Sequence, residues 1–244
     1  LSLVEGFAVV HTELLGRDKC SALDAGGDCV ILSKGHSVLI LYAYLIQGGL
    51  IDEDVFRKGY KKGASKLLGH PVKNKALGIE FSTGSLGMGL GLGVGRAFAS
   101  TKAAFEGRRE GVVVVFLGDG ELGEGSNYEA MMIANKWELD NLWCIVDCNG
   151  IQQTGTTQNV SGSLDICSIW RSFGWGVGEV RDGHSVEEIA SAIEGLRNEM
   201  QGKPKVLVLN TLKGKGLGPL EGTVDSHNCL LTSEQRMDFL KAEN

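Results

Sequence analysis

The chain has 244 residues, which is enough for one large α/β domain with a full core and too short for two such domains with linkers. Its formal charge of −6 argues against nucleic acid or an anionic membrane surface as a partner, because both favour clustered lysine and arginine. Every long apolar stretch is interrupted by glycine before it reaches membrane-spanning length, so we expect neither an anchor nor a signal peptide.

The six cysteines show no paired zinc spacing, and some of them lie within apolar strands. Cys144 and Cys148 lack the CxxC separation, and Cys144 is most simply a small buried hydrophobic residue. We therefore expect reduced thiols and a cytoplasmic location. The set is Cys20, Cys29, Cys144, Cys148, Cys167 and Cys229.

The first predicted element is a helix over residues 1–15, with Ser2 as a candidate N-cap. A short apolar strand over 29–32 and an apolar helix over 38–47 follow, joined by Ser33-Lys34-Gly35-His36. Such a strand-to-helix junction can present side chains and N–H groups to an anionic or hydroxylated ligand. His36 is therefore a candidate for substrate contact, with a purely structural histidine as the alternative.

A second histidine, His70, lies in Gly69-His70-Pro71, where the proline keeps it out of helical geometry. A glycine-rich helix is expected after the segment 81–87, Phe-Ser-Thr-Gly-Ser-Leu-Gly. Its glycines recur at 87, 91 and 95 and at 89 and 93, which places them on common faces of the helix. Each costs the helix about 1 kcal/mol relative to alanine, so the pattern implies close packing, either within the domain or against another subunit.

The central prediction concerns the strand over 112–117, which is apolar, β-branched and typical of a parallel strand buried on both faces. It ends at Gly118-Asp119-Gly120. A helix over 124–139 and a second apolar strand over 142–146 follow, and the second strand ends near Asp147, Asn149 and Gly150. A right-handed crossover makes the two strands parallel, so Asp119 and Asn149 are expected at the same sheet edge.

A carboxylate, an amide oxygen and a backbone carbonyl such as that of Ile151 suit Mg²⁺ or Ca²⁺, together with the oxygens of a bound phosphate. Asp-Gly and Asn-Gly are also common turn formers, so two ordinary turns are the alternative.

The remaining elements continue the alternation of strands and helices, and His184 is expected to support the turn before the last helix. We expect a loop over 151–167, a strand over 174–180, a helix over 186–200, a strand over 205–209 and a lysine-containing loop over 210–218. The 210–218 loop lacks the spacing of a Walker loop. The fold expected is α/β, a mostly parallel sheet with helices on both faces, as one domain over residues 1–244.

The Gly118-Asp119-Gly120 sequence, followed by Glu121-Leu122-Gly123-Glu124-Gly125 and by Asn149 about thirty residues on, resembles the diphosphate-binding motif of thiamine diphosphate enzymes. The resemblance implies that Asp119, Asn149 and the Ile151 carbonyl hold a divalent cation on the cofactor's diphosphate. It also implies that Gly118 and Gly120 contact the diphosphate.

The order of the remaining motifs resembles the N-terminal part of transketolases along nearly the whole chain. These motifs are Ser33-Lys34-Gly35-His36, Gly69-His70-Pro71, the 82–87 segment and Lys213-Gly214-Lys215-Gly216. The chain therefore resembles the stand-alone N-terminal subunit of a split transketolase. The resemblance implies transfer of a two-carbon ketol unit from a ketose to an aldose, with thiamine diphosphate and Mg²⁺ or Ca²⁺.

The resemblance also implies residue roles. His36 and His70 would contact the donor sugar near the thiazolium, and the backbone at Gly84 and Leu86 would contact the aminopyrimidine. His227 matches a further active-site histidine, although Ser226 replaces the tryptophan or tyrosine usual before it. Met88 replaces a frequent glutamine.

Two acids after the cofactor motif, Glu124 and Glu129, match residues of a proton-sharing network between the two active sites of a transketolase dimer. Their alternative role is that of acids in the first turn of a helix.

Two parts of the family pattern are missing from the sequence. A Ser-Gly-His-Pro motif normally precedes the segment that resembles Leu1-Ser2-Leu3. The pyrimidine-binding domain, which carries the glutamate that activates the cofactor, is also absent. We therefore expect the chain to be inactive alone and to form an α2β2 assembly with a C-terminal transketolase subunit. The alternatives are the α subunit of a 2-oxo acid dehydrogenase, a 1-deoxyxylulose-5-phosphate synthase fragment, and a non-catalytic module.

Overall fold

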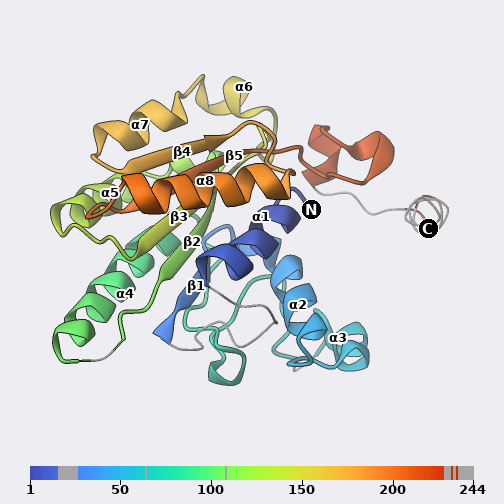
Figure 1. The fold of residues 1–244 in the computed structure, drawn as a ribbon. Helices are drawn as coiled ribbons and strands as arrows, with labels where there is room; N and C mark the ends of the chain where they lie inside the picture. The colour runs from blue at the N-terminus through green and yellow to red at the C-terminus, as the bar shows by residue number, and fades with distance from the viewer. Residues whose placement is uncertain (16–26, 64, 108, 228–231, 233–234, 236–244) are drawn as a thin grey trace.

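A five-stranded parallel sheet forms the centre of the computed structural model, which describes residues 1–15, 27–63, 65–107, 109–227, 232 and 235 (Figure 1). The strand order is β1-β2-β3-β5-β4, and every neighbouring pair is parallel. The strands are β1 (Cys29–Leu32), β2 (Val113–Gly118), β3 (Leu142–Cys148), β4 (Gly176–Val180) and β5 (Lys205–Asn210). Nearly every residue of β1, β2, β3 and β5 is buried, which explains their uninterrupted apolar sequences.

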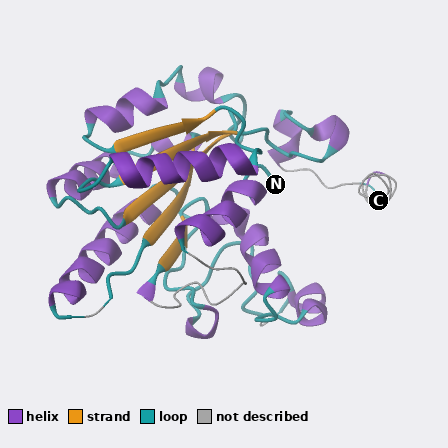
Figure 2. Ribbon diagram, in the orientation of Figure 1, coloured by secondary structure: helices purple, strands orange, loops and turns teal. Residues whose placement is uncertain are grey.

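Helices cover both faces of this sheet (Figure 2). On one face, side chains of α1, α2 and α8 pack with alternate strand residues such as Val114 and Phe116. On the other, α4, α5 and α7 pack with the intervening residues, such as Val113 and Val115. The predicted α/β fold with helices on both faces is therefore confirmed. No helix in the described ranges is long and apolar enough to cross a membrane.

The helices have the following bounds: α1 Val4–Val9, α2 Val38–Gln47, α3 Glu53–Gly59, α4 Met88–Phe105, α5 Ser126–Lys136, α6 Thr157–Ser161, α7 Ile166–Ser172 and α8 Val186–Glu199. Residues Val10–Leu14 continue α1 as a π-helical turn. Short 3-10 turns occupy Gly35–Ser37, Lys75–Leu77, Gly120–Gly123, Gly218–Leu220 and Val224–His227.

Two predictions about where helices begin were wrong. Leu3, not Ser2, occupies the N-cap position of α1, and the Ser2 hydroxyl donates instead to Asp147 Oδ2 at 2.7 Å. Glu124 precedes α5 in an extended conformation, so it is not an acid of the first helical turn, whereas Glu129 is.

The segment 151–167, expected to be a loop, contains α6 and the beginning of α7. Both helices are capped locally, because Thr156 accepts from the Asn159 N–H at 3.2 Å and Asp165 accepts from the Ser168 N–H at 2.9 Å. Helix α3 was also not predicted, and Asp52 caps it in the same way.

The glycines of α4 serve the two faces of the helix differently. A Cβ on Gly89 would overlap Ser33, and one on Gly93 would overlap Val115 of β2. Outside the helix itself, no atom of the described residues lies within 4 Å of a Cβ built on Gly91 or Gly95. Close packing within the domain therefore accounts for Gly89 and Gly93, while a contact of the outer glycines with another subunit stays a prediction.

Among the described cysteines, Cys29, Cys144 and Cys167 are buried and Cys148 is half-buried. Cys20 and Cys229 lie outside the described residues.

Candidate active site

A cavity of about 750 Å³ lies at the carboxyl edge of the sheet, where β2 and β3 end. This is the edge at which open α/β sheets usually bind ligands. Residues from several separate loops line it, including most of the predicted site: His36, His70, Gly84, Leu86, Gly118, Asp119, Gly120, Glu124, Asn149 and Ile151. Two predicted residues are not on its lining: Glu129, which is exposed on α5, and His227, which ends the turn Val224–His227.

Asp119 follows β2 directly and is 4% exposed. Its Oδ1 accepts from the Gly120 N–H at 2.8 Å. Its Oδ2 accepts from the Gly150 N–H at 2.8 Å and from the Thr157 hydroxyl at 2.9 Å. The carboxylate is therefore held between the loop after β2 and the loop after β3, and the convergence expected from the parallel crossover is present.

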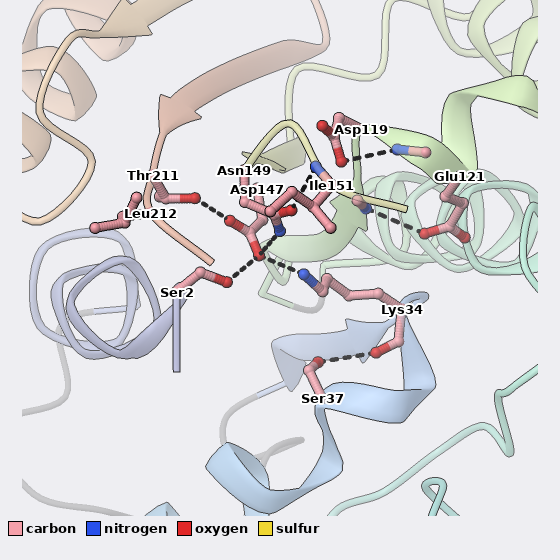
Figure 3. A network of polar contacts seen from close by, with 12 residues as sticks. Ser2, Lys34, Ser37, Asp119, Glu121, Asp147, Asn149, Ile151, Thr211 and Leu212 are labelled. Carbon is pink, nitrogen blue, oxygen red and sulfur yellow. Dashed lines mark hydrogen bonds and ion pairs between the residues drawn. The ribbon is translucent and has the colours of Figure 1, made fainter. Parts of the chain in front are cut away.

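Asn149 has an amide whose orientation is fixed by both of its ends. The Nδ2 group donates to Asp147 Oδ2 at 3.2 Å, and Oδ1 accepts from the Ile151 N–H at 3.2 Å (Figure 3). No group of three histidine, cysteine, aspartate or glutamate side chains suited to a metal occurs in the described part of the chain. A cation held by the Asp119 carboxylate, the Asn149 amide oxygen and the Ile151 carbonyl would have an oxygen ligand from each, which fits Mg²⁺ or Ca²⁺.

Asp147 is fully buried inside β3 and accepts hydrogen bonds from four directions (Figure 3). The donors are the Ser2 hydroxyl at 2.7 Å, Asn149 Nδ2 at 3.2 Å, the Lys34 ammonium and the Thr211 hydroxyl. Burial acts to raise the pKa of Asp147, but the Lys34 ammonium and the hydroxyl donors outweigh burial and hold it well below its usual range. Asp147 thus stays ionised and connects the N-terminal segment with the ends of β1, β3 and β5.

Two lysines bring positive charge to the cavity. Lys34 pairs with Asp147, whereas Lys213 has no salt-bridge partner among the described residues. Burial and the nearby Lys34 ammonium lower the pKa of Lys213, while Asp147 and Asp119 act in the opposite direction. A bound anion such as a diphosphate would relieve the repulsion between the two ammonium groups, so this lining suits an anionic ligand.

Glu121 is 2% exposed and belongs to the turn Gly120–Gly123, which directly follows Asp119. Its Oε1 accepts from the Ser33 hydroxyl and from the Gly87 N–H, the latter at 2.8 Å, and its Oε2 accepts from the Gly118 N–H at 3.2 Å. Burial raises the pKa of Glu121, and the hydrogen bonds from Ser33, Gly87 and Gly118 oppose that effect.

The two candidate histidines line the same cavity, and both are exposed. His36 lies in the turn Gly35–Ser37 that leads into α2, so the predicted strand-to-helix junction is confirmed. His70 packs against Gly84, because a Cβ on Gly84 would come within 3.1 Å of His70 Cδ2. Gly84 has a φ of +150°, so this position requires glycine on two grounds.

Residues 3–242 match the family model for the thiamine diphosphate binding domain of transketolase. The chain belongs to this transketolase family. It is 37% identical over 228 residues to one subunit of the apulose-4-phosphate transketolase of Actinobacillus succinogenes, covering 93% of this chain and 80% of that protein. It is 36% identical over 234 residues to 6-deoxy-6-sulfo-D-fructose transketolase subunit SqwG of a Clostridium species, covering 96% of this chain and 82% of that protein.

Solved transketolases have the same fold. The structure of the Pichia stipitis enzyme with sedoheptulose 7-phosphate has a TM-score of 0.85 at 30% identity and covers 99% of this chain. The Leishmania mexicana enzyme has a TM-score of 0.85 at 30% identity and covers 97% of this chain. The chain spans 36% of each of these two proteins. The relatives of similar length, which are single transketolase subunits, thus confirm the predicted resemblance to a stand-alone N-terminal subunit.

Several residues of this transketolase-family site were not predicted from the sequence. Thr157 and Asp147 orient the two candidate cation ligands, and Ser33 and Glu121 connect loops of the cavity wall. The sequence offered one signal for Asp147, which is a carboxylate directly after the apolar run 142–146. Ser185, not His184, caps α8, and the His184 side chain instead connects its turn to two other segments, because its Nε2 accepts from the Leu212 N–H at 2.9 Å and its Nδ1 lies 3.1 Å from Glu5 Oε2.

Proposed function

We propose that this chain is the diphosphate-binding subunit of a two-subunit transketolase, which transfers a two-carbon ketol unit from a ketose to an aldose. The observation that carries the proposal is the cavity in which Asp119, Asn149 and Ile151 lie together with Lys34 and Lys213. Its oxygen atoms suit a hard divalent cation, and its ammonium groups suit a diphosphate.

The residues divide into two functional groups in this proposal. Asp119, Asn149 and the Ile151 carbonyl would hold Mg²⁺ or Ca²⁺, and Lys34 and Lys213 would neutralise the diphosphate of thiamine diphosphate. When bound, this cofactor supplies the electron sink for breaking the carbon–carbon bond next to a ketose carbonyl.

Substrate handling is assigned to the exposed wall of the cavity. His36 and His70 would orient the sugar hydroxyls and transfer protons there, because imidazole can donate or accept a proton near neutral pH. His227 would be a third such group. Glu124 lines the cavity and Glu129 is exposed on α5, so these acids would connect the site to a neighbouring protomer.

A second polypeptide completes the enzyme in this proposal. The similarity to proteins named as one subunit of a transketolase supports a partner, which we infer to be a C-terminal subunit with a pyrimidine-binding domain in an α2β2 assembly. The family match favours this reading over a 2-oxo acid dehydrogenase subunit or a 1-deoxyxylulose-5-phosphate synthase fragment. Phosphorylated or sulfonated sugars are the first substrates to test, since two relatives are named for apulose 4-phosphate and 6-deoxy-6-sulfo-D-fructose.

The test is a reconstitution assay with a donor and acceptor screen. This chain and its C-terminal partner are purified separately and mixed with thiamine diphosphate, Mg²⁺, a ketose and an aldose. Ketol transfer is expected from the mixture and from neither polypeptide alone. Turnover by this chain alone would contradict the shared site, and a mixture that binds the cofactor but transfers no ketol unit to any aldose would contradict the activity.

A further inference from the structure

Glu121 lies where three segments of the cavity wall meet. Its carboxylate accepts from Ser33 at the end of β1, from the Gly87 N–H at the start of α4 and from the Gly118 N–H at the end of β2. Gly118 ends β2 and Ser33 directly follows the neighbouring parallel strand β1, whereas Gly87 is the N-cap of a helix that packs on the sheet. One buried side chain therefore fixes the helix start relative to both strand ends.

Glu121 also provides a cap for α4 that the helix lacks locally. The N-cap position is Gly87, which has no side chain and has a φ of +81°. The Gly87 N–H donates to Glu121 Oε1 at 2.8 Å, and the Gly89 N–H donates to Ser33 Oγ at 3.1 Å. Since the first N–H groups of a helix have no partners within it, Glu121 and Ser33 together satisfy two groups that would otherwise be unpaired.

The contacts around this cap leave no space for adjustment. A Cβ on Gly87 would lie 2.5 Å from Glu124 Cβ and 2.7 Å from Ser126 Oγ, and one on Gly89 would overlap Ser33. The backbone of Gly84 and Leu86, which lines the cavity, immediately precedes this fixed point. The position of that backbone therefore depends on the Glu121 carboxylate.

The burial of Glu121 is not explained by an ion pair. No cation lies within salt-bridge distance of Glu121 among the described residues, and the three groups that donate to its carboxylate are neutral. Asp28, a similarly buried carboxylate at the opposite end of β1, pairs with Arg109 at 2.9 Å. Burying a carboxylate without a paired cation costs stability, so a role in the site is the better explanation for Glu121.

We propose that Glu121 is a positioning residue for thiamine diphosphate. It holds the Gly84–Leu86 backbone, which would face the aminopyrimidine, at a fixed separation from the Gly118–Asp119 turn, which would face the diphosphate. This inference rests on the proposed function, but it assigns to Glu121 a role separate from cation binding and from contact with the sugar.

The experiment compares a ligand that would fill the whole site, thiamine diphosphate, with one that would fill only its diphosphate end, inorganic pyrophosphate. Calorimetry on the complex of this chain with its C-terminal partner measures Mg²⁺-dependent binding of thiamine diphosphate and, separately, of inorganic pyrophosphate, which reaches only the diphosphate end. The variants are Glu121→Ala and Glu121→Gln, with Asp28→Asn as the matched buried carboxylate away from the site. Hydrogen exchange of the peptide 82–90 reports directly on the Gly87 and Gly89 amides.

Glu121→Ala is expected to weaken thiamine diphosphate binding by about tenfold or more, the equivalent of one good hydrogen bond, and pyrophosphate binding by less than about threefold. Glu121→Gln should recover part of the affinity, because its amide oxygen still accepts from Ser33 and Gly87, whereas its amide nitrogen cannot accept from the Gly118 N–H. Amide hydrogen exchange in the 82–90 peptide should be faster in Glu121→Ala than in the wild type. It should not become faster in Glu121→Gln or Asp28→Asn. Asp28→Asn should bind both ligands as the wild type does.

Three results would overturn the inference: unchanged thiamine diphosphate binding by Glu121→Ala, equal losses for the two ligands, or no recovery by Glu121→Gln. Failure of the wild-type complex to bind thiamine diphosphate contradicts the proposed function instead, which keeps the two failures distinguishable. If Glu121→Ala does not fold, Ser33→Ala replaces it, because that variant removes the hydroxyl between Glu121 and the Gly89 N–H and has the same expected ratio of losses.

Discussion

Asp147 shows how a single buried charge connects the parts of the site. It is fully buried, it pairs with Lys34, and it accepts from side chains of the N-terminal segment and of the β5 end. It also fixes the amide of Asn149 so that Oδ1 faces Ile151. Stability and site geometry therefore depend on the same carboxylate.

Replacement of Asp147 by Asn is expected to destabilise the chain by about 3–5 kcal/mol, because it leaves the Lys34 ammonium buried without a counter-charge. Urea unfolding of the isolated chain measures this free energy. Glu53→Gln is the control, since its ion pair with Arg57 is exposed at both ends and is worth at most about 1 kcal/mol. A loss in Asp147→Asn no larger than that of the control would contradict the structural importance of the buried pair.

The stability contribution of Asp147 should depend on acid pH. Its folded-state pKa is depressed, so the contribution is fully present above the unfolded pKa of about 4 and is lost as pH falls through the folded pKa below it. The difference in unfolding free energy between the wild type and Asp147→Asn should therefore narrow as pH falls from about 5 to about 2. A difference that stays constant over that range would show that folding does not lower the pKa of Asp147.

At the scale of elements, α4 is a long helix whose glycines are packed on one face and open on the other. Gly93 lies against Val115 of strand β2, whereas a Cβ on Gly91 would have no neighbour within 4 Å in the part of the chain that the structure describes. The two positions are two residues apart in the same helix, so the helix-forming gain from alanine is the same for both.

Gly93→Ala is expected to destabilise the chain by about 1–3 kcal/mol, because the added methyl group overpacks the contact with Val115. The higher helix propensity of alanine offsets only part of this destabilisation. Gly91→Ala is expected to stabilise the isolated chain by about 0.5–1 kcal/mol. Denaturant unfolding of both variants provides the measurement. Similar effects of the two substitutions would contradict the assignment of the faces. Weaker association of Gly91→Ala with a partner or second copy would support the predicted intersubunit contact.

The sequence predicted the elements whose signal is local. The unbroken apolar runs of β2 and β3 and the glycine spacing of α4 identified these elements, and Gly118-Asp119-Gly120 with Asn149 identified the site. The short helices α3 and α6 were missed because neither buries a residue, so a side-chain cap marks each of them and an apolar face does not. Helix α7 also begins at a side-chain cap, and it was missed although it buries Cys167 and Trp170.

The missed parts of the site have a different cause. Ser2 was taken for a helix cap, but its hydroxyl contacts Asp147, 145 residues away in the chain. Glu121 likewise contacts Ser33, 88 residues earlier. Local periodicity contains no information about such long-range hydrogen bonds, so these roles became apparent only in the folded structure.

At the scale of the whole molecule, the described residues form a parallel sheet with helices on both faces and a cavity at the carboxyl edge of the sheet. The cavity has one end lined by Asp119 and Asn149, the proposed cation ligands, and an exposed wall with His36 and His70. In the proposed enzyme, a second polypeptide covers this edge and supplies the acid that activates the cofactor. The relatives of similar length are named as one subunit of a transketolase, which supports that division.

Calorimetric titration of thiamine diphosphate into this chain mixed with its C-terminal partner tests the central claim most directly. The account predicts saturable binding with Mg²⁺, loss of that binding when a chelator removes the cation, and at least about a hundredfold weaker binding by Asp119→Ala, as expected when a metal ligand is removed. No uptake by the wild-type mixture, or equal uptake with and without the divalent cation, would contradict it.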